Sequence, residues 1–106
     1  MWTSDIIMMN GKLMPYADAQ IHPLSLAVTY ATTVFEGLRA YYMPETKEFA
    51  LFRLDDHIKR LQAGMKVMRF DQTYETEYFR KCLSDLIKAN KPDSDVYIRL
   101  LVYIEG

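Results

Sequence analysis

Two amphipathic helices are predicted between residues 54 and 87, and they restrict the fold more than any other feature of the chain. In each helix the apolar residues recur at spacings of three and four, which places them on one face. The stripe of the first helix is Leu54, Ile58, Leu61, Met65 and Met68, and that of the second is Phe79, Cys82, Leu83, Leu86 and Ile87. Thr73 is expected to cap the second helix. Each stripe has to be buried against another layer of the fold.

Strands are predicted on both sides of these helices. Asn10 and Gly11 form a strong hairpin turn because both accept a positive φ, and strands are expected before and after them at 6–9 and 12–15. A second hairpin is expected from 38–43 and 49–52, and residues 96–104 form a long segment rich in strand-forming residues.

Residues 24–36 allow two interpretations, since they favour either a strand or a short helical turn that ends at Gly37. Residues 16–23 are expected to form a loop. Hairpins followed by two helices and a strand predict an α+β fold, with an antiparallel sheet packed by two main helices.

The composition is that of one soluble globular domain. The chain has 106 residues, of which 50% are hydrophobic and 25% charged. A net charge of −1 does not indicate a surface for nucleic acid or for a membrane. Cys82 is the single cysteine, which excludes an internal disulfide and suits a reducing compartment, and the apolar run at 6–9 is too short for a signal peptide. We therefore expect a cytoplasmic protein with no nucleic-acid or membrane partner.

Several kinds of self-contained catalysis lack support in the sequence. The four glycines are scattered, so that no glycine-rich phosphate loop is present. The two histidines, His22 and His57, have no spacing typical of metal ligands, and no serine stands in a nucleophile context. No metal site is predicted.

Arg60 is the strongest candidate for binding an anion. Helix geometry places it about 120° from the centre of the apolar stripe, with His57 and Gly64 one turn to either side. A cation next to a small residue and an imidazole is a plausible seat for a phosphate. The alternative is an ordinary solvated arginine on the side of a helix.

Tyr97 and Arg99 form a second candidate site. Alternation along the strand sends them to one face, while Val96, Ile98 and Leu100 point to the other. A tyrosine and an arginine side by side could bind a carboxylate. The alternative is an arginine in a surface ion pair.

Two motifs together resemble the branched-chain aminotransferases, which are class IV, fold type IV enzymes dependent on pyridoxal 5'-phosphate. The run His57-Ile58-Lys59-Arg60-Leu61 is similar to the family's His-x-x-Arg-Leu, whose arginine binds the cofactor phosphate. This resemblance implies that Arg60 binds the phosphate and that His57 supports it.

The second motif is Tyr-Ala-Thr-Thr-Val-Phe-Glu-Gly-Leu-Arg-Ala-Tyr at 30–41. By resemblance, Phe35 lines the pocket for the substrate side chain, Gly37 leaves room beside it, and Tyr30 reaches the active site of the other subunit of a homodimer. Thr29 and Ala31 stand on either side of Tyr30, where the family usually has histidine and glycine.

The tripeptide Tyr97-Ile98-Arg99 is also similar to a family segment, one that accommodates acidic and branched substrates in turn. The resemblance implies that Tyr97 and Arg99 bind substrate. Leu100 departs from the family's usual proline at the next position.

The lysine that such an enzyme needs for its Schiff base is not evident in this chain. None of the seven lysines stands where a catalytic amine is expected. In the family this lysine belongs to a second, larger domain. We therefore expect residues 1–106 to be the N-terminal small domain, with no catalytic residue of its own, inactive alone and binding pyridoxal phosphate weakly or not at all.

The resemblance implies that the full-length protein is a transaminase in branched-chain amino acid metabolism. It would move the amino group between branched-chain L-amino acids and 2-oxoglutarate. A D-amino acid transaminase or an aminodeoxychorismate lyase of the same fold is the alternative. A non-catalytic dimerisation module that kept only the fold is a further one, because a dimer-forming sheet face uses the same aromatic residues.

Overall fold

Two antiparallel sheets and two long helices form the part of the chain that the computed structural model describes, residues 4–104. Their sequence order is β1 (Ile6–Met9), β2 (Lys12–Pro15), the 3-10 turn η1 (Tyr16–Asp18), α1 (Leu26–Thr29), β3 (Thr33–Met43), β4 (Glu48–Leu51), α2 (Leu54–Val67), α3 (Thr76–Asn90) and β5 (Val96–Tyr103). The predicted α+β class, with an antiparallel sheet packed by two main helices, is confirmed. No helix in this part of the chain is long and apolar enough to span a membrane.

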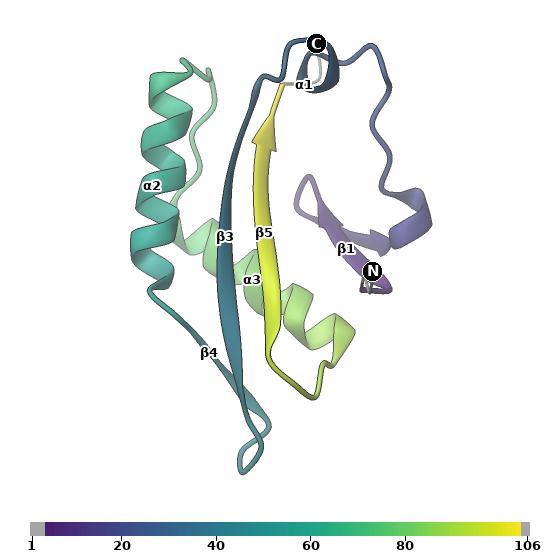
Figure 1. Ribbon diagram of the computed structural model, residues 1–106, viewed down its shortest axis with the longest axis vertical. Helices are drawn as coiled ribbons and strands as arrows, with labels where there is room; N and C mark the ends of the chain where they lie inside the picture. The colour runs from purple at the N-terminus through teal and green to yellow at the C-terminus, as the bar shows by residue number, and fades with distance from the viewer. Residues whose placement is uncertain (1–3, 105–106) are drawn as a thin grey trace.

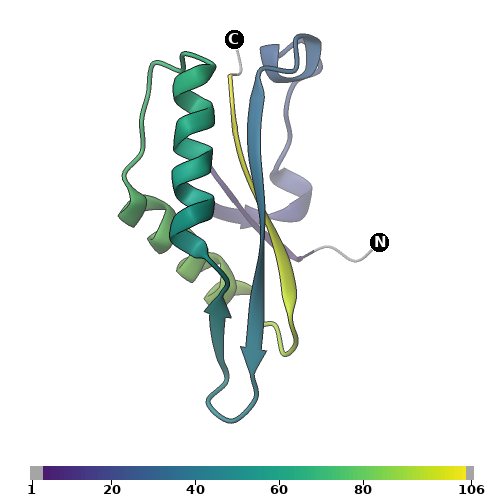
Figure 2. The same cartoon turned by 60° about the vertical axis from the view of Figure 1, so that its left-hand side comes forward.

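The larger sheet has β3 at its centre, in the order β4-β3-β5, and both pairings are antiparallel. β3 and β5 lie side by side over most of their length, with α3 behind them and α2 alongside β3 (Figure 1). The same arrangement is visible after rotation (Figure 2). One face of the β3–β5 pair is therefore covered by helices, and no helix of the described residues covers the other.

The core lies between the helices and the covered face of the sheet. One cluster joins the sheet to α3 through Leu38, Ala40, Ile98 and Leu83. A second cluster joins α2 to α3 through Ile58, Leu61 and Phe79. Side chains of a strand alternate between its faces, so that every second residue of β3 and β5 contributes to this core while its neighbours point away.

The N-terminal hairpin packs against α3 rather than joining the larger sheet. β1 and β2 are connected by Asn10 and Gly11, whose φ values of 54° and 77° are those that a two-residue hairpin turn requires. At the end of α3, the Asn90 side chain accepts a hydrogen bond from the Ile6 N–H and donates one to the Ile6 carbonyl. The hairpin that the sequence predicts is thus confirmed at its predicted bounds.

Two predictions about helix ends are wrong. Thr73 does not cap α3, which begins at Thr76 after an extended Glu75. The reason is tertiary: the Tyr74 carbonyl accepts a hydrogen bond from Gln62 on α2, and its ring packs on Tyr78 and Phe79. These contacts hold the segment before α3 extended.

The other error concerns Met68, which the periodicity assigns to the apolar stripe of the first helix. α2 ends at Val67, and Arg69 has a left-handed φ of 59°, so that the chain turns away. Met68 is exposed as a result.

Both interpretations of residues 24–36 are correct in part. Leu26–Thr29 is a short helix, and β3 begins at Thr33. Gly37 does not end a helix but lies inside β3.

Candidate functional site

Four of the predicted substrate residues meet on the open face of the larger sheet. Phe35 and Gly37 come from β3, and Tyr97 and Arg99 come from β5. In the antiparallel register Gly37 lies opposite Arg99, which places Phe35 and Tyr97 on either side of that pair. Phe35 and Tyr97 are 61% and 56% exposed, so this face presents aromatic surface outward.

The space at Gly37 is occupied by Tyr97. A Cβ atom at position 37 would overlap the Tyr97 hydroxyl and the adjacent ring carbons. Glycine therefore lets the hydroxyl end of the tyrosine ring approach the backbone of β3 closely. The room that Gly37 was expected to leave beside Phe35 is taken, in this structure, by the Tyr97 side chain.

Arg99 lies between the two aromatic rings. Its guanidinium carbon is 5.4 Å from the centroid of the Phe35 ring and 5.8 Å from that of Tyr97, within the range of cation–π attraction. None of the ion pairs in the described part of the chain involves Arg99. A guanidinium without an acidic partner, held between rings, can bind a carboxylate through its planar fork.

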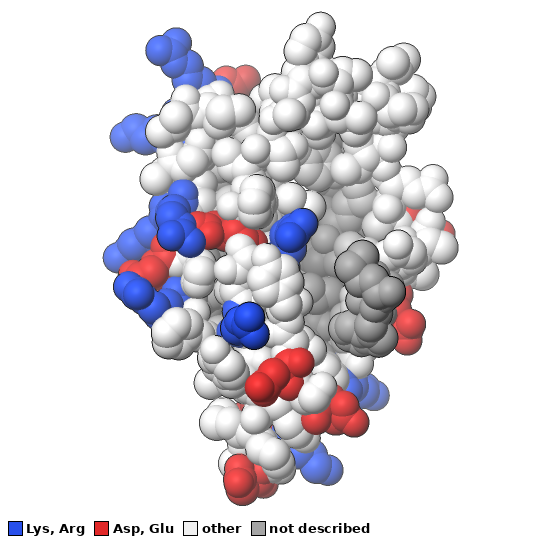
Figure 3. Space-filling view, in the orientation of Figure 1, with Lys and Arg blue, Asp and Glu red and all other residues white. Residues whose placement is uncertain are grey.

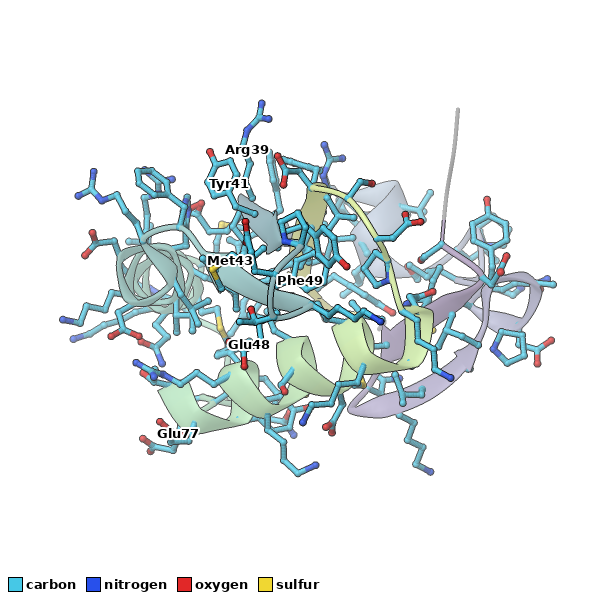
Figure 4. All side chains as sticks on the ribbon, turned by 90° about the horizontal axis from the view of Figure 1, so that it is seen from below. Arg39, Tyr41, Met43, Glu48, Phe49 and Glu77 are labelled. Atoms are coloured by element: carbon cyan, nitrogen blue, oxygen red, sulfur yellow. The ribbon has the colours of Figure 1, made fainter. Side chains whose placement is uncertain are left out.

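The same face continues along β3 toward Arg39 and Tyr41. Seen from below, both side chains point away from α3 (Figure 4). Tyr41 contacts Phe52 edge-on, with 6.2 Å between ring centroids. The open face thus combines aromatic rings with guanidinium groups over most of the length of β3.

Tyr30 stands apart from this cluster. It ends α1, where its N–H donates to the Leu26 carbonyl, and it is 75% exposed. No hydrogen bond or ring contact links it to the four residues above within residues 4–104. The next residue, Ala31, has a left-handed φ of 52°, a conformation that glycine adopts without strain.

Arg60 lies on the flank of α2 and binds a buried carboxylate of β3. Its Nε and Nη2 donate to the two oxygens of Glu36, and the Nη2–Oε2 distance is 2.9 Å. The Arg60 side chain is 72% exposed, whereas that of Glu36 is 7% exposed. Arg60 is thus largely exposed on the side of the helix, as the alternative interpretation expects, and it also pairs with a buried carboxylate.

His57 approaches the same carboxylate. Its Nδ1 is 3.5 Å from Glu36 Oε2, one helical turn before Arg60. Hydrogen bonding by Arg60 holds the pKa of Glu36 below its ordinary value, against the opposing effect of burial. The same bonds raise the pKa of Arg60. Both groups stay charged at neutral pH.

Sequence reasoning missed Glu36. The signal was available in the alternation of β3, because Val34, Glu36 and Leu38 share the face that points toward the helices. A carboxylate on that face needs a buried partner. Arg60 was the cation expected on the flank of the adjacent helix, with the His57 imidazole one turn before it.

Gly64 serves helix packing. A Cβ atom at this position would be 3.4 Å from Cγ1 of Val34, so the small residue lets α2 approach β3 closely. Gly64 thus faces β3, and it is not what keeps Arg60 accessible. Arg60 is accessible because its own side chain is exposed to solvent.

All seven lysines lie at the surface. Lys81 forms an ion pair with Asp85, which raises the pKa of its amine, whereas a catalytic amine needs a lowered pKa. No group of three or more metal-ligating side chains is present in residues 4–104. Figure 3 shows Lys and Arg side chains gathered along the side formed by α2, with acidic side chains between them.

Comparison with known proteins gives one consistent family. Residues 33–106 match the family described as amino-transferase class IV. A probable branched-chain-amino-acid aminotransferase of Synechocystis sp. is 38% identical over 98 residues, which are 92% of this chain and 32% of that protein. The chain spans about a third of the length of the curated relatives it matches.

Solved structures agree in fold. The branched-chain amino acid aminotransferase from Escherichia coli superimposes with a TM-score of 0.89 at 32% identity, covering 98% of this chain and 34% of that one. The branched-chain amino acid aminotransferase from Thermobaculum terrenum, solved in its PLP-form, gives a TM-score of 0.84 at 31% identity and covers 94% of this chain and 33% of that one.

Proposed function

Because the chain belongs to the class IV aminotransferase family, we propose that it is the N-terminal small domain of a branched-chain aminotransferase dependent on pyridoxal 5'-phosphate. The full-length enzyme would transfer the amino group between branched-chain L-amino acids and 2-oxoglutarate. The observation that carries this proposal is the placement of Arg99 between Phe35 and Tyr97, beside Gly37, on the open face of the sheet. The relatives named above support it.

The open face suits a substrate pair that differs in polarity. Branched-chain donors carry an apolar side chain, which the exposed rings of Phe35 and Tyr97 can cover. The acceptor carries a second carboxylate, which the guanidinium of Arg99 can bind through two N–H groups. One surface with both kinds of group can therefore accept each substrate in turn.

Arg60 fits the phosphate of the cofactor. Glu36 occupies only one edge of its guanidinium, and the exposed remainder can donate to phosphate oxygens. Pyridoxal phosphate, when bound, supplies an electron sink for the negative charge that develops on the substrate α-carbon. This chain's share is to anchor the phosphate at Arg60 and to orient the substrate at Arg99 and the two rings.

We propose that a larger domain supplies the reactive lysine, since the seven lysines of this chain are all exposed. The chain alone would then be inactive and bind the cofactor weakly. Tyr30, which contacts none of the four substrate residues, would act in the partner subunit of a homodimer. Its high exposure supports this role.

Substitution of Arg60 by alanine in the full-length protein tests the cofactor site. Loss of charge-assisted hydrogen bonds to the phosphate should weaken the binding of pyridoxal phosphate about 10- to 100-fold. Binding of pyridoxal, which lacks the phosphate, should change little. Titration of the cofactor absorbance measures both affinities.

Arg53→Ala is the matched control for that substitution. Arg53 precedes the first turn of α2, and its exposed ion pair is with Asp56. This variant should bind pyridoxal phosphate as the parent does. Equal affinity of the Arg60→Ala variant and the parent would refute the assignment of Arg60.

A further inference from the structure

We propose that Glu36 is a positioning residue for Arg60: it holds the guanidinium by one edge so that the free N–H groups face the phosphate of the cofactor. This inference rests on the proposed function, in which Arg60 is the phosphate ligand. It assigns a role to a buried carboxylate that the sequence motifs alone left unexplained.

The hydrogen bonds to Glu36 leave three N–H groups of the Arg60 guanidinium free. An arginine carries five N–H donors in a rigid plane. Glu36 accepts one from Nε and one from Nη2. The two N–H groups of Nη1 and the second one of Nη2 remain for a ligand, and the 72% exposure of the side chain leaves them accessible.

Glu36 is a rigid support because the fold holds its carboxylate. Its backbone lies in the middle of β3, opposite Leu100 of β5. Its side chain is buried on the helix side of the sheet, and His57 Nδ1 approaches Oε2 at 3.5 Å. Carboxylate and guanidinium are thus fixed between a strand and a helix.

Fixing Arg60 before the ligand arrives favours binding. A free arginine side chain on a helix surface samples many rotamers, and a ligand that orders it loses affinity. The bond to Glu36 removes that cost beforehand. The opposing effect is repulsion between the Glu36 carboxylate and a phosphate, which burial and the direct pairing with Arg60 reduce.

These two effects predict opposite results for Glu36→Gln, a substitution that keeps the shape and removes the charge. If positioning dominates, the variant of the full-length protein should bind pyridoxal phosphate about 3- to 10-fold more weakly, with pyridoxal affinity unchanged. If repulsion dominates, affinity for pyridoxal phosphate should rise, and the inference is overturned. Unchanged affinity overturns it as well.

Combining the substitutions shows whether Glu36 acts through Arg60. The Glu36→Gln, Arg60→Ala double variant should bind pyridoxal phosphate no more weakly than Arg60→Ala alone. A further loss in the double variant would contradict the inference and leave the phosphate assignment of Arg60 intact. If Arg60→Ala by itself has no effect, the proposed function has failed at this site, and the inference fails with it.

Two further variants distinguish the positioning of Arg60 by Glu36 from the general effect of removing a negative charge near α2. Asp56→Asn removes a carboxylate from the first turn of the same helix, where it pairs with Arg53, and should leave affinity for both probes unchanged. Glu36→Asp keeps the charge but retracts the carboxylate by one methylene, so it should weaken binding of pyridoxal phosphate as Glu36→Gln does. Full affinity in Glu36→Asp would contradict positioning, and thermal unfolding of each variant verifies that it folds.

Discussion

Ala31 is in the left-handed region, with a φ of 52°, next to the exposed Tyr30. Alanine has a steric cost there that glycine avoids, although glycine also has more freedom to lose on folding. We expect Ala31→Gly to raise the free energy of unfolding by about 0.5–1 kcal/mol, measured by denaturant titration of the chain.

The control for Ala31→Gly is the same substitution in a helix. Ala63 lies exposed in the middle of α2, and Ala63→Gly should lower the free energy of unfolding by about 1 kcal/mol. If glycine destabilises both positions equally, the backbone at Ala31 does not carry the strain inferred here.

The ion pair of Glu36 makes stability depend on pH. The pKa of Glu36 lies below its ordinary value of 4.5 because Arg60 hydrogen-bonds to it. A group with a lowered pKa stabilises the fold fully above its unfolded pKa, and this contribution is lost as pH falls through the folded pKa. Below about pH 4.5 the free energy of unfolding should therefore fall less steeply in Glu36→Gln than in the parent.

A pH series of denaturant titrations measures these slopes. Glu45→Gln is the control, since Glu45 lies exposed in the turn between β3 and β4, and its slope should match the parent. Identical slopes for the parent and Glu36→Gln would show that the ion pair does not stabilise the fold.

At the scale of elements, the Asn90 side chain links the N-terminal hairpin to α3 by hydrogen bonds. Asn90 bonds to both backbone groups of Ile6 and to the Leu86 carbonyl. Asn90→Ala should lower the free energy of unfolding by about 1–3 kcal/mol, because the Ile6 N–H loses its acceptor, while the Ile6 carbonyl keeps the Ser4 hydroxyl as a donor. Amide hydrogen exchange in β1 should accelerate more than that in β3.

Lys88→Ala provides the comparison for Asn90→Ala. Lys88 is exposed in the last turn of α3, so its loss should leave exchange in β1 unchanged. Protection of β1 that survives in Asn90→Ala would mean that apolar packing alone holds the hairpin.

The sequence predicts elements better than it predicts the contacts between them. Asn10-Gly11 and the stripe of α2 carry local signals, and the structure agrees with both except at Met68, which lies beyond the end of the helix. The prediction that Thr73 caps α3 failed because Tyr74 is held by α2, through a hydrogen bond between residues 12 apart in the chain. The pairing of Arg60 with Glu36 was missed for the same reason, since it depends on how closely α2 approaches β3.

The sequence predicted which residues lie on the open face, but not how their side chains are arranged there. Alternation along the strands placed Tyr97 and Arg99 on one face, as the structure has them. The filling of the space at Gly37 by Tyr97 follows from the register of β3 on β5. Register depends on long-range pairing, which spacing within one strand does not reveal.

At the scale of the whole molecule, Leu83 of α3 links helix to sheet. It is 1% exposed and packs in the cluster with Leu38, Ala40 and Ile98. Leu83→Ala should lower the free energy of unfolding by about 2–5 kcal/mol, a large fraction of the total for a domain of this size. Calorimetry should show a lower melting temperature with one transition.

Leu101→Ala is the matched control on the opposite face. Leu101 is 52% exposed on β5, so its truncation should cost less than about 1 kcal/mol. A similar loss of stability in both variants would mean that the open face is buried in solution.

β3 carries Glu36 on one side and Phe35 and Gly37 on the other. Residues of the two faces, each with its own role, therefore alternate along a single strand. Substitutions at exposed odd-numbered positions such as Phe35 can change what the open face accepts while Glu36 behind it stays constant, whereas Gly37 is restricted because a Cβ atom there would overlap Tyr97. A deletion of one residue within the strand would exchange the two sets and spoil both. This strand therefore tolerates substitutions at its exposed positions but not changes in length.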